Sequence, residues 1–423
     1  MPAIPRDDRP DSTWALLSEG YPFIMNRCRR FGSDLFTARL MFTPAICMSG
    51  PEAARVFYEP GRFTRNGALP TTALRALQDK GSVQTLDGDA HRRRKAMFME
   101  LMTPPAIARL QDLVAAEWAA AAERWHGAPN GVVLLAEARG VLCRAAGRWI
   151  GLPLTDAEAD RRTAEIGAMI DGAASVGPRN WRALWLRRRT ERWLRAVVAE
   201  VRAGRRAAEP DGALAVVAAY REPDGRPLDL PVAAVELLNV LRPIVAVARF
   251  IVFAALALHE HPHWRDRIRD GDGDGDSDAT EWFVQEVRRL APFFPMVGGR
   301  VREPFAWHGH DFAPGTWVLL DLFGTNRDPR AWEDPEAFRP ERFRDRAISA
   351  YEMIPQGGGG FETGHRCPGE WITIALMKTS VRVLAAGLDY RVPDQDLSVD
   401  LTRMPAAPRS RFIIADVRRR LTV

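Results

Sequence analysis

Hydrophobic and polar positions follow two different periods along the chain, and each period predicts a different kind of element. Between Leu35 and Met48 the alternation predicts a small β-hairpin, and Pro51–Phe57 has the pattern of a short helix. From Pro104 to about Leu258 apolar residues recur at helical spacing. We therefore predict a helical layer whose helices are separated at glycine-containing breaks, namely Gly151, 171–177, 207–212 and 222–227.

The last third of the chain has shorter runs. Strand-like segments at 300–301, 316–322 and 411–414 flank a coil rich in glycine and proline, and 373–388 predicts one more helix. The predicted fold class is mostly α with small β-sheets. Without an internal repeat or a long linker, we expect a single domain over residues 1–423. Its expected parts are a β-rich edge (about 21–70), a helical core (about 71–295) and a mixed β and coil region (about 296–423).

The composition is that of an ordinary globular protein. Hydrophobic residues make up 46% of the chain and charged residues 27%, which excludes disordered, collagen-like and disulfide-stapled classes. The 59 Lys and Arg exceed the 54 Asp and Glu only slightly, and they are spread along the chain. We therefore predict no nucleic-acid partner.

The cysteines and the apolar runs bear on location. The four cysteines form no C-x-x-C pair, and the first residues are polar and broken by proline, which favours a reduced, cytoplasmic protein. The longest apolar stretch, Val232–Leu258, contains residues that a lipid-buried span excludes. We predict a buried helix and no membrane span, because of Glu236, Arg242, Pro243 and Arg249.

An alternating Gly/Asp tract raises the question of calcium. Asp270, Asp272, Asp274, Gly275 and Glu281 fit the spacing of a calcium loop, whose ligands are hard oxygens. Such a tract satisfies the pattern almost automatically, and no second loop exists to pair with it. A solvated connector is the preferred interpretation, and calcium binding stays open.

The run from His259 to His263 spells H-E-x-x-H, a zinc signature. That chemistry needs both histidines on one helical face, and Pro262 between them breaks the helix. We interpret the run as a helix end that carries surface histidines.

The run Trp181–Arg195 combines tryptophan with arginine. It fits either a basic, aromatic face for lipid or nucleic acid, or a solvated helix face with its tryptophans packed inward. We prefer the second interpretation.

The segment Pro355–Glu370 carries the strongest chemical signal. Four consecutive glycines, 357–360, let the backbone pass close to something flat or bulky, and Cys367 lies just before a predicted helix, beside His365 and Arg366. Positive potential there favours the thiolate, which is a nucleophile or a metal ligand. The alternative is a structural cysteine after a flexible loop.

The order of motifs resembles the cytochrome P-450 superfamily. Glu286-Val287-Arg288-Arg289 matches its E-x-x-R helix, Pro340-Glu341-Arg342-Phe343 its P-x-R-F segment and Cys367-Pro368-Gly369 its C-x-G loop. The resemblance implies haem b buried between a long central helix and the cysteine loop, with the Cys367 thiolate bound to iron. It also implies that Glu286, Arg289 and Arg342 form a structural ion-pair triad.

The resemblance implies further contacts with haem. His91 and Lys95, one helical turn apart, are candidates to meet the haem propionates, and Arg65 is a third. Arg366, Gly359 and Gly360 are the other residues that we expect to contact the cofactor. A solvated basic turn would have the same sequence pattern as the 91–95 segment.

The central helix departs from the common pattern of the superfamily. Leu238–Ala246 has no acid-alcohol pair to relay protons, and carries Arg242 followed by Pro243. A buried guanidinium without a partner costs several kcal/mol, so Arg242 implies an anion, and Pro243 should kink the helix and open space beside it. Glu236 is an alternative partner, but six residues place it on the opposite side of a helix.

Together, the Arg242-Pro243 pair, the elongated glycine loop 357–360 and the segment Gln84–Gly88 resemble the bacterial fatty-acid peroxygenases. That resemblance implies a fatty-acid substrate whose carboxylate is held by Arg242 and replaces the missing proton relay. It also implies that hydrogen peroxide is the oxidant and that no dedicated redox partner is required. Hydroxylation is expected at Cα and/or Cβ. Members that form terminal alkenes tend to carry His at the position of Gln84, and hydroxylating members carry Gln. The resemblance therefore implies that decarboxylation is a minor reaction at most. Phe293 and Phe294 are expected to line the substrate channel, although aromatic residues there also serve as core.

Two other functions remain open from the sequence. One is a reductase-dependent haem-thiolate monooxygenase of the same fold, which would need ferredoxin and NADPH. The other is a non-catalytic sensor that binds haem and lipid without turnover. Catalytic roles are assigned to Arg242, Pro243 and Gln84 under the preferred hypothesis.

Overall fold

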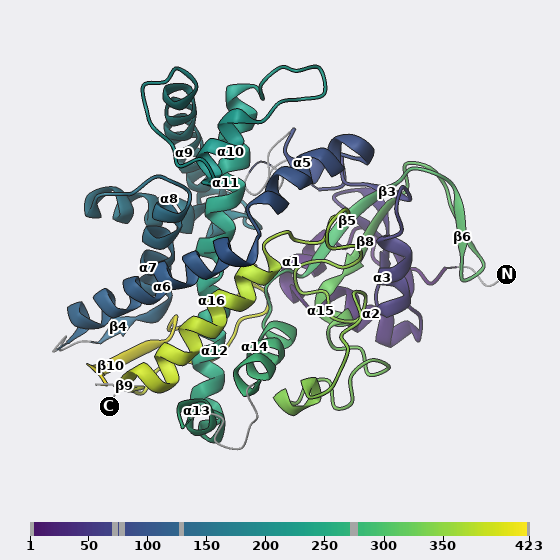
Figure 1. Ribbon diagram of the computed structural model, residues 1–423. Coiled ribbons are helices and arrows are strands. Elements are labelled where there is room, and N and C mark those ends of the chain that lie inside the picture. The colour runs from purple at the N-terminus through teal and green to yellow at the C-terminus, as the bar shows by residue number, and fades with distance from the viewer. Residues whose placement is uncertain (1–3, 70–74, 76–80, 127–130, 271–277, 421–423) are drawn as a thin grey trace.

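The computed structural model describes residues 4–69, 75, 81–126, 131–270 and 278–420. It is mostly helical with small sheets, as predicted from the sequence. Helices fill one side of the molecule, and the largest sheet lies on the other side with the amino-terminal helices (Figure 1). The centre of the proposed calcium tract, 271–277, lies outside the described residues; of its ends, Asp270 pairs with Arg269 and Glu281 with Lys378.

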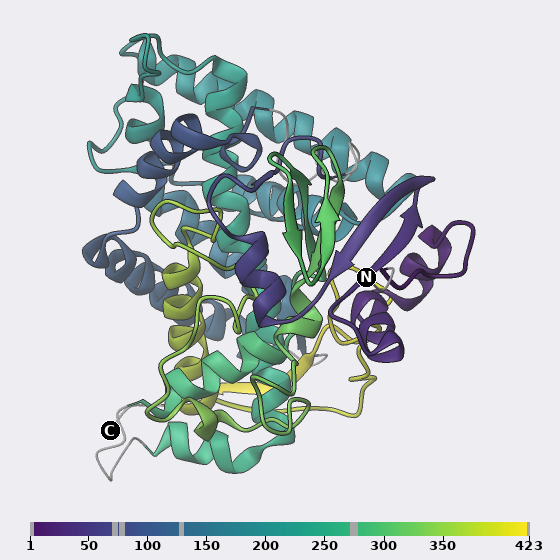
Figure 2. The same ribbon diagram turned by 90° about the vertical axis from the view of Figure 1, so that its right-hand side faces the viewer.

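The largest sheet joins strands from the amino-terminal part of the chain to strands from its last third. The predicted hairpin forms from β1 (Leu35–Leu40) and β2 (Thr43–Met48), with Leu35 opposite Met48. The strand order is β1-β2-β8-β5-β3, in which β2 runs parallel to β8. Figure 2 shows the β1–β2 hairpin, in purple, from the side of this sheet. The neighbouring elements are α1 (Thr13–Glu19), α2 (Phe23–Phe31), α3 (Pro51–Phe57), β3 (Phe63–Thr64), β5 (Met296–Val301) and β8 (Trp317–Asp321).

The predicted helical layer is present, and its breaks fall where glycine interrupts the pattern. Two of its helices begin at side-chain caps: Thr103 accepts a hydrogen bond from the Ala106 N–H, and Thr155 forms a capping box with Glu158. The helices are α5 (Gly88–Glu100), α6 (Pro104–Trp125), α7 (Leu134–Trp149), α8 (Asp156–Gly172), α9 (Pro178–Arg202) and α10 (Ala213–Ala219).

The long central helix consists of α11 (Leu230–Ala246) and α12 (Ala248–Glu260). Within the described residues, the combined span Leu230–Glu260 is long and apolar enough to cross a membrane, but 89% of its most apolar window is buried in the protein. The predicted kink is displaced: α11 runs through Pro243, and the interruption falls one turn later. There the Val247 N–H bonds the Ile244 carbonyl, so the hydrogen-bond ladder shortens at Val247.

The remaining elements complete the fold. Since α12 ends at Glu260 and α13 begins at Pro262, the H-E-x-x-H run does not lie on one helix, and the described residues hold no group of three metal-ligating side chains. The elements are η1 (Val83–Thr85), β4 (Val132–Val133), α13 (Pro262–Arg269), α14 (Ala279–Leu290), β6 (Phe305–Trp307), β7 (His310–Phe312), α15 (Leu322–Thr325), η2 (Pro340–Phe343), α16 (Glu370–Arg382), η3 (Val383–Gly387), β9 (Leu388–Arg391) and β10 (Ile413–Arg419).

A buried ion-pair triad anchors α14 to η2, as the resemblance implied. Glu286 and Arg289 are both fully buried, with Arg289 Nε 2.7 Å from a Glu286 carboxylate oxygen. Arg342 Nε lies 3.2 Å from the same carboxylate, and the Arg339 N–H donates to it. Because each charge is paired, this cluster holds the segment that leads into the cysteine loop.

One expectation about α9 is wrong for two of the three tryptophans of the run, whereas the third, Trp193, packs against the core. Trp181 and Trp185 are 67% and 56% exposed rather than packed inward. The helix buries its other face, where Ala183, Leu186 and Leu194 pack inward, and this places both tryptophan rings on the outside.

Candidate active site

The cysteine loop holds Cys367 close to α16. The Cys367 N–H donates to the Gln356 carbonyl, which fixes the loop, and the Gln356 side-chain nitrogen lies 3.9 Å from the sulfur. The Gly369 backbone N–H also donates to the sulfur. Cys367 remains partly accessible, whereas Cys47 and Cys143 are buried. The loop therefore presents one thiol with hydrogen-bond donors directed at it.

The predicted preference for thiolate is wrong for the protein without cofactor. Burial raises the pKa of the Cys367 thiol, and this effect outweighs the Gly369 N–H and the nearby Lys95 and Arg288 cations, which lower the pKa. A cationic metal at the sulfur would reverse the balance, because a coordinating thiol is deprotonated outright.

Four basic side chains gather beside the cysteine loop. The rings of His91 and His365 lie with their centroids 4.0 Å apart, and the Lys95 ammonium donates to the Gly364 and Arg366 carbonyls. Burial, then Lys95, lowers the pKa of His91 to about 4, and burial lowers the pKa of Lys95 to about 8. Arg65 lies near enough to lower the pKa of both histidines. A site crowded with basic groups in this way suits an anionic ligand.

Arg65 and Arg366 each have a partner within the protein. Arg65 donates to the Gly298 carbonyl and lies over the Phe57 ring. Arg366 pairs with Glu370 at 2.6 Å, and Glu370 also pairs with Arg288. Contact of either arginine with haem therefore stays a prediction.

The glycine loop packs closely against an aromatic ring. Gly357 and Gly359 have positive φ angles of 92° and 77°, which favour glycine. A Cβ on Gly359 would lie 2.8 Å from the Tyr58 Cβ, so the flat neighbour of Gly359 in this structure is Tyr58. A Cβ on Gly360 would be no closer than 3.6 Å to its neighbours. The predicted haem contacts of both glycines remain predictions.

Arg242 is a buried cation without a carboxylate partner among the described residues. Its side chain is 7% exposed, its Nε has no hydrogen-bond partner, and its terminal nitrogen donates to the Asn239 side-chain oxygen at 3.4 Å. Burial, then Arg187, lowers the pKa of Arg242 to about 9, while the charge of Cys367 raises it. Arg242 therefore lies within electrostatic reach of Cys367, on the central helix.

The alternative partner, Glu236, has other contacts. It is fully buried and pairs with Arg94 at 2.8 Å, and it accepts the Val83 N–H. Asn239 donates to Glu236 and to the Gln84 side-chain oxygen, at 3.1 and 3.3 Å. Asn239 thus links Gln84 to Arg242, as expected for neighbours in one site. The sequence analysis missed the role of Asn239, and its polar side chain within an apolar helix was the available signal.

The two predicted channel residues differ in their surroundings. Phe293 stacks on Phe250 of α12, with ring centroids 4.3 Å apart, and its carbonyl accepts the Tyr21 hydroxyl. Phe294 is 39% exposed and meets Phe293 edge-on. Phe293 therefore packs against the central helix, and lining of a channel by either ring stays a prediction.

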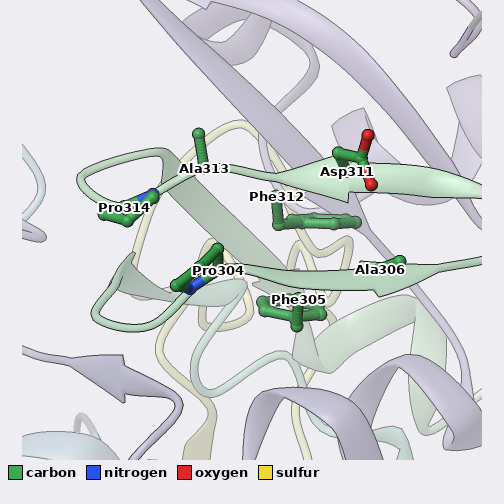
Figure 3. A pocket seen from close by; sticks show the side chains of 7 residues that line it. All are labelled: Pro304, Phe305, Ala306, Asp311, Phe312, Ala313 and Pro314. Carbon is green, nitrogen blue, oxygen red and sulfur yellow. The ribbon is translucent and has the colours of Figure 1, made fainter.

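A separate hollow at the β6–β7 hairpin has a different character. It measures about 400 Å³ and surrounds the stacked rings of Phe305 and Phe312, 4.5 Å apart (Figure 3). Asp311 is the charged residue in its lining, which carries no cation and no thiol. This hollow does not fit the chemistry of the cysteine site.

The residues around Cys367 fit a haem. A thiol with two hydrogen-bond donors suits an iron ligand, and the basic cluster of His91, Lys95 and Arg65 suits two propionates. The Arg242 Nε is buried without a hydrogen-bond partner in the described part of the chain, which suits a further anionic ligand. Cys367 would hold the iron, and the basic cluster would hold the carboxylates.

The chain is similar to known proteins. The cytochrome P-450 family profile matches residues 278–384. Curated relatives include (+)-menthofuran synthase of Mentha piperita, 35% identical over 129 residues, and the sarpagan bridge enzyme of Gelsemium sempervirens, 34% identical over 112 residues. These alignments cover 29% and 25% of this chain and span 25% and 21% of the relatives' length.

Solved structures match over the whole chain. Cytochrome P450SP alpha (CYP152B1) with (R)-ibuprophen is 42% identical with a TM-score of 0.93, over 97% of this chain and 99% of its own. Cytochrome P450EX alpha (CYP152N1) with myristic acid is 39% identical with a TM-score of 0.94, over 99% and 100%. A variant of OleT in complex with arachidonic acid is 32% identical with a TM-score of 0.94, over all of both chains. The chain therefore belongs to the cytochrome P-450 superfamily, in its CYP152 fatty-acid peroxygenase branch, and is a haem-thiolate enzyme.

Proposed function

We propose that the protein hydroxylates long-chain fatty acids at Cα and/or Cβ with hydrogen peroxide. One C–H hydrogen of the acid is replaced by hydroxyl, and peroxide is reduced to water. The observation that carries this proposal is Arg242, a buried cation near Cys367 that has no carboxylate partner among the described residues, while Glu236 on the same helix is paired with Arg94. A substrate carboxylate supplies the missing anion. The carboxylic acids bound by the similar structures support this choice.

When bound, the haem iron supplies the oxidising centre for peroxide cleavage and oxygen transfer. Arg242 binds and orients the substrate carboxylate, which accepts a proton from hydrogen peroxide and returns it to the departing oxygen. Asn239 holds the Arg242 side chain and so positions the headgroup. Pro243 follows Arg242 and leaves the Asn239 carbonyl without its helical donor. Fixing the carboxylate restricts reaction to the adjacent carbons.

Gln84 bears on the product. Its side-chain oxygen accepts a hydrogen bond from Asn239, and an amide does not titrate in the range where a histidine would. We therefore propose that Gln84 borders the reaction site without donating or accepting protons. Hydroxylated acids should be the main products, and terminal alkenes minor ones at most.

Peroxide alone should drive turnover of myristic acid. The expected products of the purified, haem-loaded protein with myristic acid and hydrogen peroxide, without reductase, are 2- and 3-hydroxymyristic acid, identified by mass spectrometry. No product with peroxide, together with product when ferredoxin, its reductase and NADPH are added, would instead identify a reductase-dependent monooxygenase. Stoichiometric binding of the acid without any oxidised product would identify a sensor.

A further inference from the structure

The outer face of α9 carries tryptophan and arginine together. Trp181 and Trp185 are 67% and 56% exposed, and Arg188 and Arg192 follow at spacings of three and four residues, on the same stripe of the helix. Arg182 is exposed beside them. In the described part of the chain Arg182, Arg188 and Arg192 have no carboxylate partner, whereas the nearby Arg189 pairs with Glu165. This stripe, the α9 face, is both aromatic and cationic.

An arginine-lined pocket adjoins the start of α9. It measures about 250 Å³ and lies between the end of α8, the first turn of α9 and the segment 400–411. Its floor includes Asp171, which is already paired with Arg139 and Arg249. Its exposed arginines are Arg179, Arg403, Arg409 and Arg411. Arg409 pairs with Asp396 at 4.0 Å, and the other three arginines exceed the one remaining carboxylate of the lining, Asp400. The pocket therefore has a net positive rim.

A second exposed aromatic group lies near the amino-terminal end of the chain. Trp14 and Phe42 are each 78% exposed, and hydrogen bonds from the hairpin turn to Thr13 and Asp11 hold the α1 and hairpin segments together. The chain after α1 contacts the segment that carries part of the pocket lining, because the Tyr21 N–H donates to the Leu401 carbonyl. Leu401 lies two residues before Arg403 of the rim.

We propose that this surface docks on an anionic lipid bilayer, from which the enzyme takes its fatty acid. Tryptophan is the side chain that favours the boundary between headgroups and acyl chains, and unpaired arginines are attracted to anionic headgroups. A second copy of the chain fits less well, since a self-complementary contact would place arginine against arginine. Nucleic acid fits the arginines but leaves Trp14 and Phe42 without partners.

Docking explains how the proposed function reaches a poorly soluble substrate, but its test does not depend on turnover. The haem-loaded protein is sedimented with vesicles of phosphatidylcholine, with or without phosphatidylglycerol, at low salt. We expect binding to the anionic vesicles and weak binding to the neutral ones. Each arginine near such a surface contributes a factor of about five, so Arg188→Glu with Arg192→Glu should weaken binding more than about 25-fold. Trp181→Ala with Trp185→Ala should weaken it at least about tenfold.

Matched controls separate this surface from net charge and from exposed tryptophan in general. Arg124→Glu with Arg302→Glu changes the net charge equally at exposed positions on α6 and after β5, and Trp371→Ala removes a tryptophan that is 51% exposed on α16. Both controls should bind as the parent protein does.

The proposal is overturned if the parent does not bind anionic vesicles or if controls and α9 variants weaken binding equally. It is also overturned if the α9 variants instead abolish dimers or nucleic-acid complexes in lipid-free solution. Lack of vesicle binding with intact peroxide-driven turnover refutes docking alone, and vesicle binding without turnover refutes the proposed function alone.

Discussion

Replacing Arg242 with leucine should reduce kcat/KM for fatty acids with peroxide at least about a hundredfold while the protein stays folded and retains haem. The guanidinium is 7% exposed and has no carboxylate partner in the described residues, so its loss removes the anchor of the substrate headgroup. The same change should leave the substrate-free protein as stable as before, or more stable by about 1 kcal/mol, because an unpaired buried charge disappears. Steady-state kinetics and thermal unfolding measure the two effects.

Arg249→Leu is the matched control on the same helix. Arg249 is also buried, but its guanidinium pairs with Asp171 and donates to the Ala406 carbonyl at 2.7 Å. We expect this variant to lose about 1–3 kcal/mol of stability, since buried partners lose a donor, and to keep most of its turnover per folded molecule. Equal loss of turnover in both variants would contradict a specific headgroup role for Arg242.

Glu286→Ala should produce the largest loss of stability, about 3–5 kcal/mol in the free energy of unfolding. The substitution leaves Arg289 buried without its carboxylate and removes the acceptor of the Arg342 side chain and the Arg339 N–H. Because η2 leads to the cysteine loop, haem retention should fall together with stability. Denaturant unfolding and the haem-to-protein absorbance ratio measure the effect.

Glu341→Ala is the control, because this neighbouring glutamate is exposed and forms no ion pair in the described structure. It should shift stability by less than about 0.5 kcal/mol. Glu286→Gln, which keeps the shape and one acceptor oxygen, should fall between the two. A Glu286→Ala protein within 1 kcal/mol of the parent would show that the triad is not required for the fold.

Local patterns predicted much of the fold because their causes are local. The β1–β2 hairpin and α3 follow from alternation and from a proline at the helix start, and the breaks in the helical layer follow from glycine. The parallel pairing of β2 with β8 was not predicted. It joins two strands that are far apart in the sequence, and no short-range pattern specifies such a partner.

In the candidate site, too, contacts set by local helix geometry could be predicted, and contacts set by long-range packing could not. The six-residue spacing of Glu236 and Arg242 correctly indicated that they do not pair directly, because helical geometry decides it. The actual partner of Glu236, Arg94, is 142 positions away and could not be inferred. The link from Gln84 through Asn239 to Arg242 likewise depends on packing between η1 and α11. Exposure of Trp181 and Trp185 depends on which face of α9 its neighbours cover.

The comparison of myristic acid with its methyl ester tests most directly whether the substrate carboxylate acts as the missing acid-base group. The two molecules share one chain, but the ester cannot pair with Arg242 as an anion and cannot accept and return the proton. With hydrogen peroxide and no reductase, we predict hydroxylated product from the acid and none above background from the ester. Oxidation of the ester at a comparable rate would contradict the account.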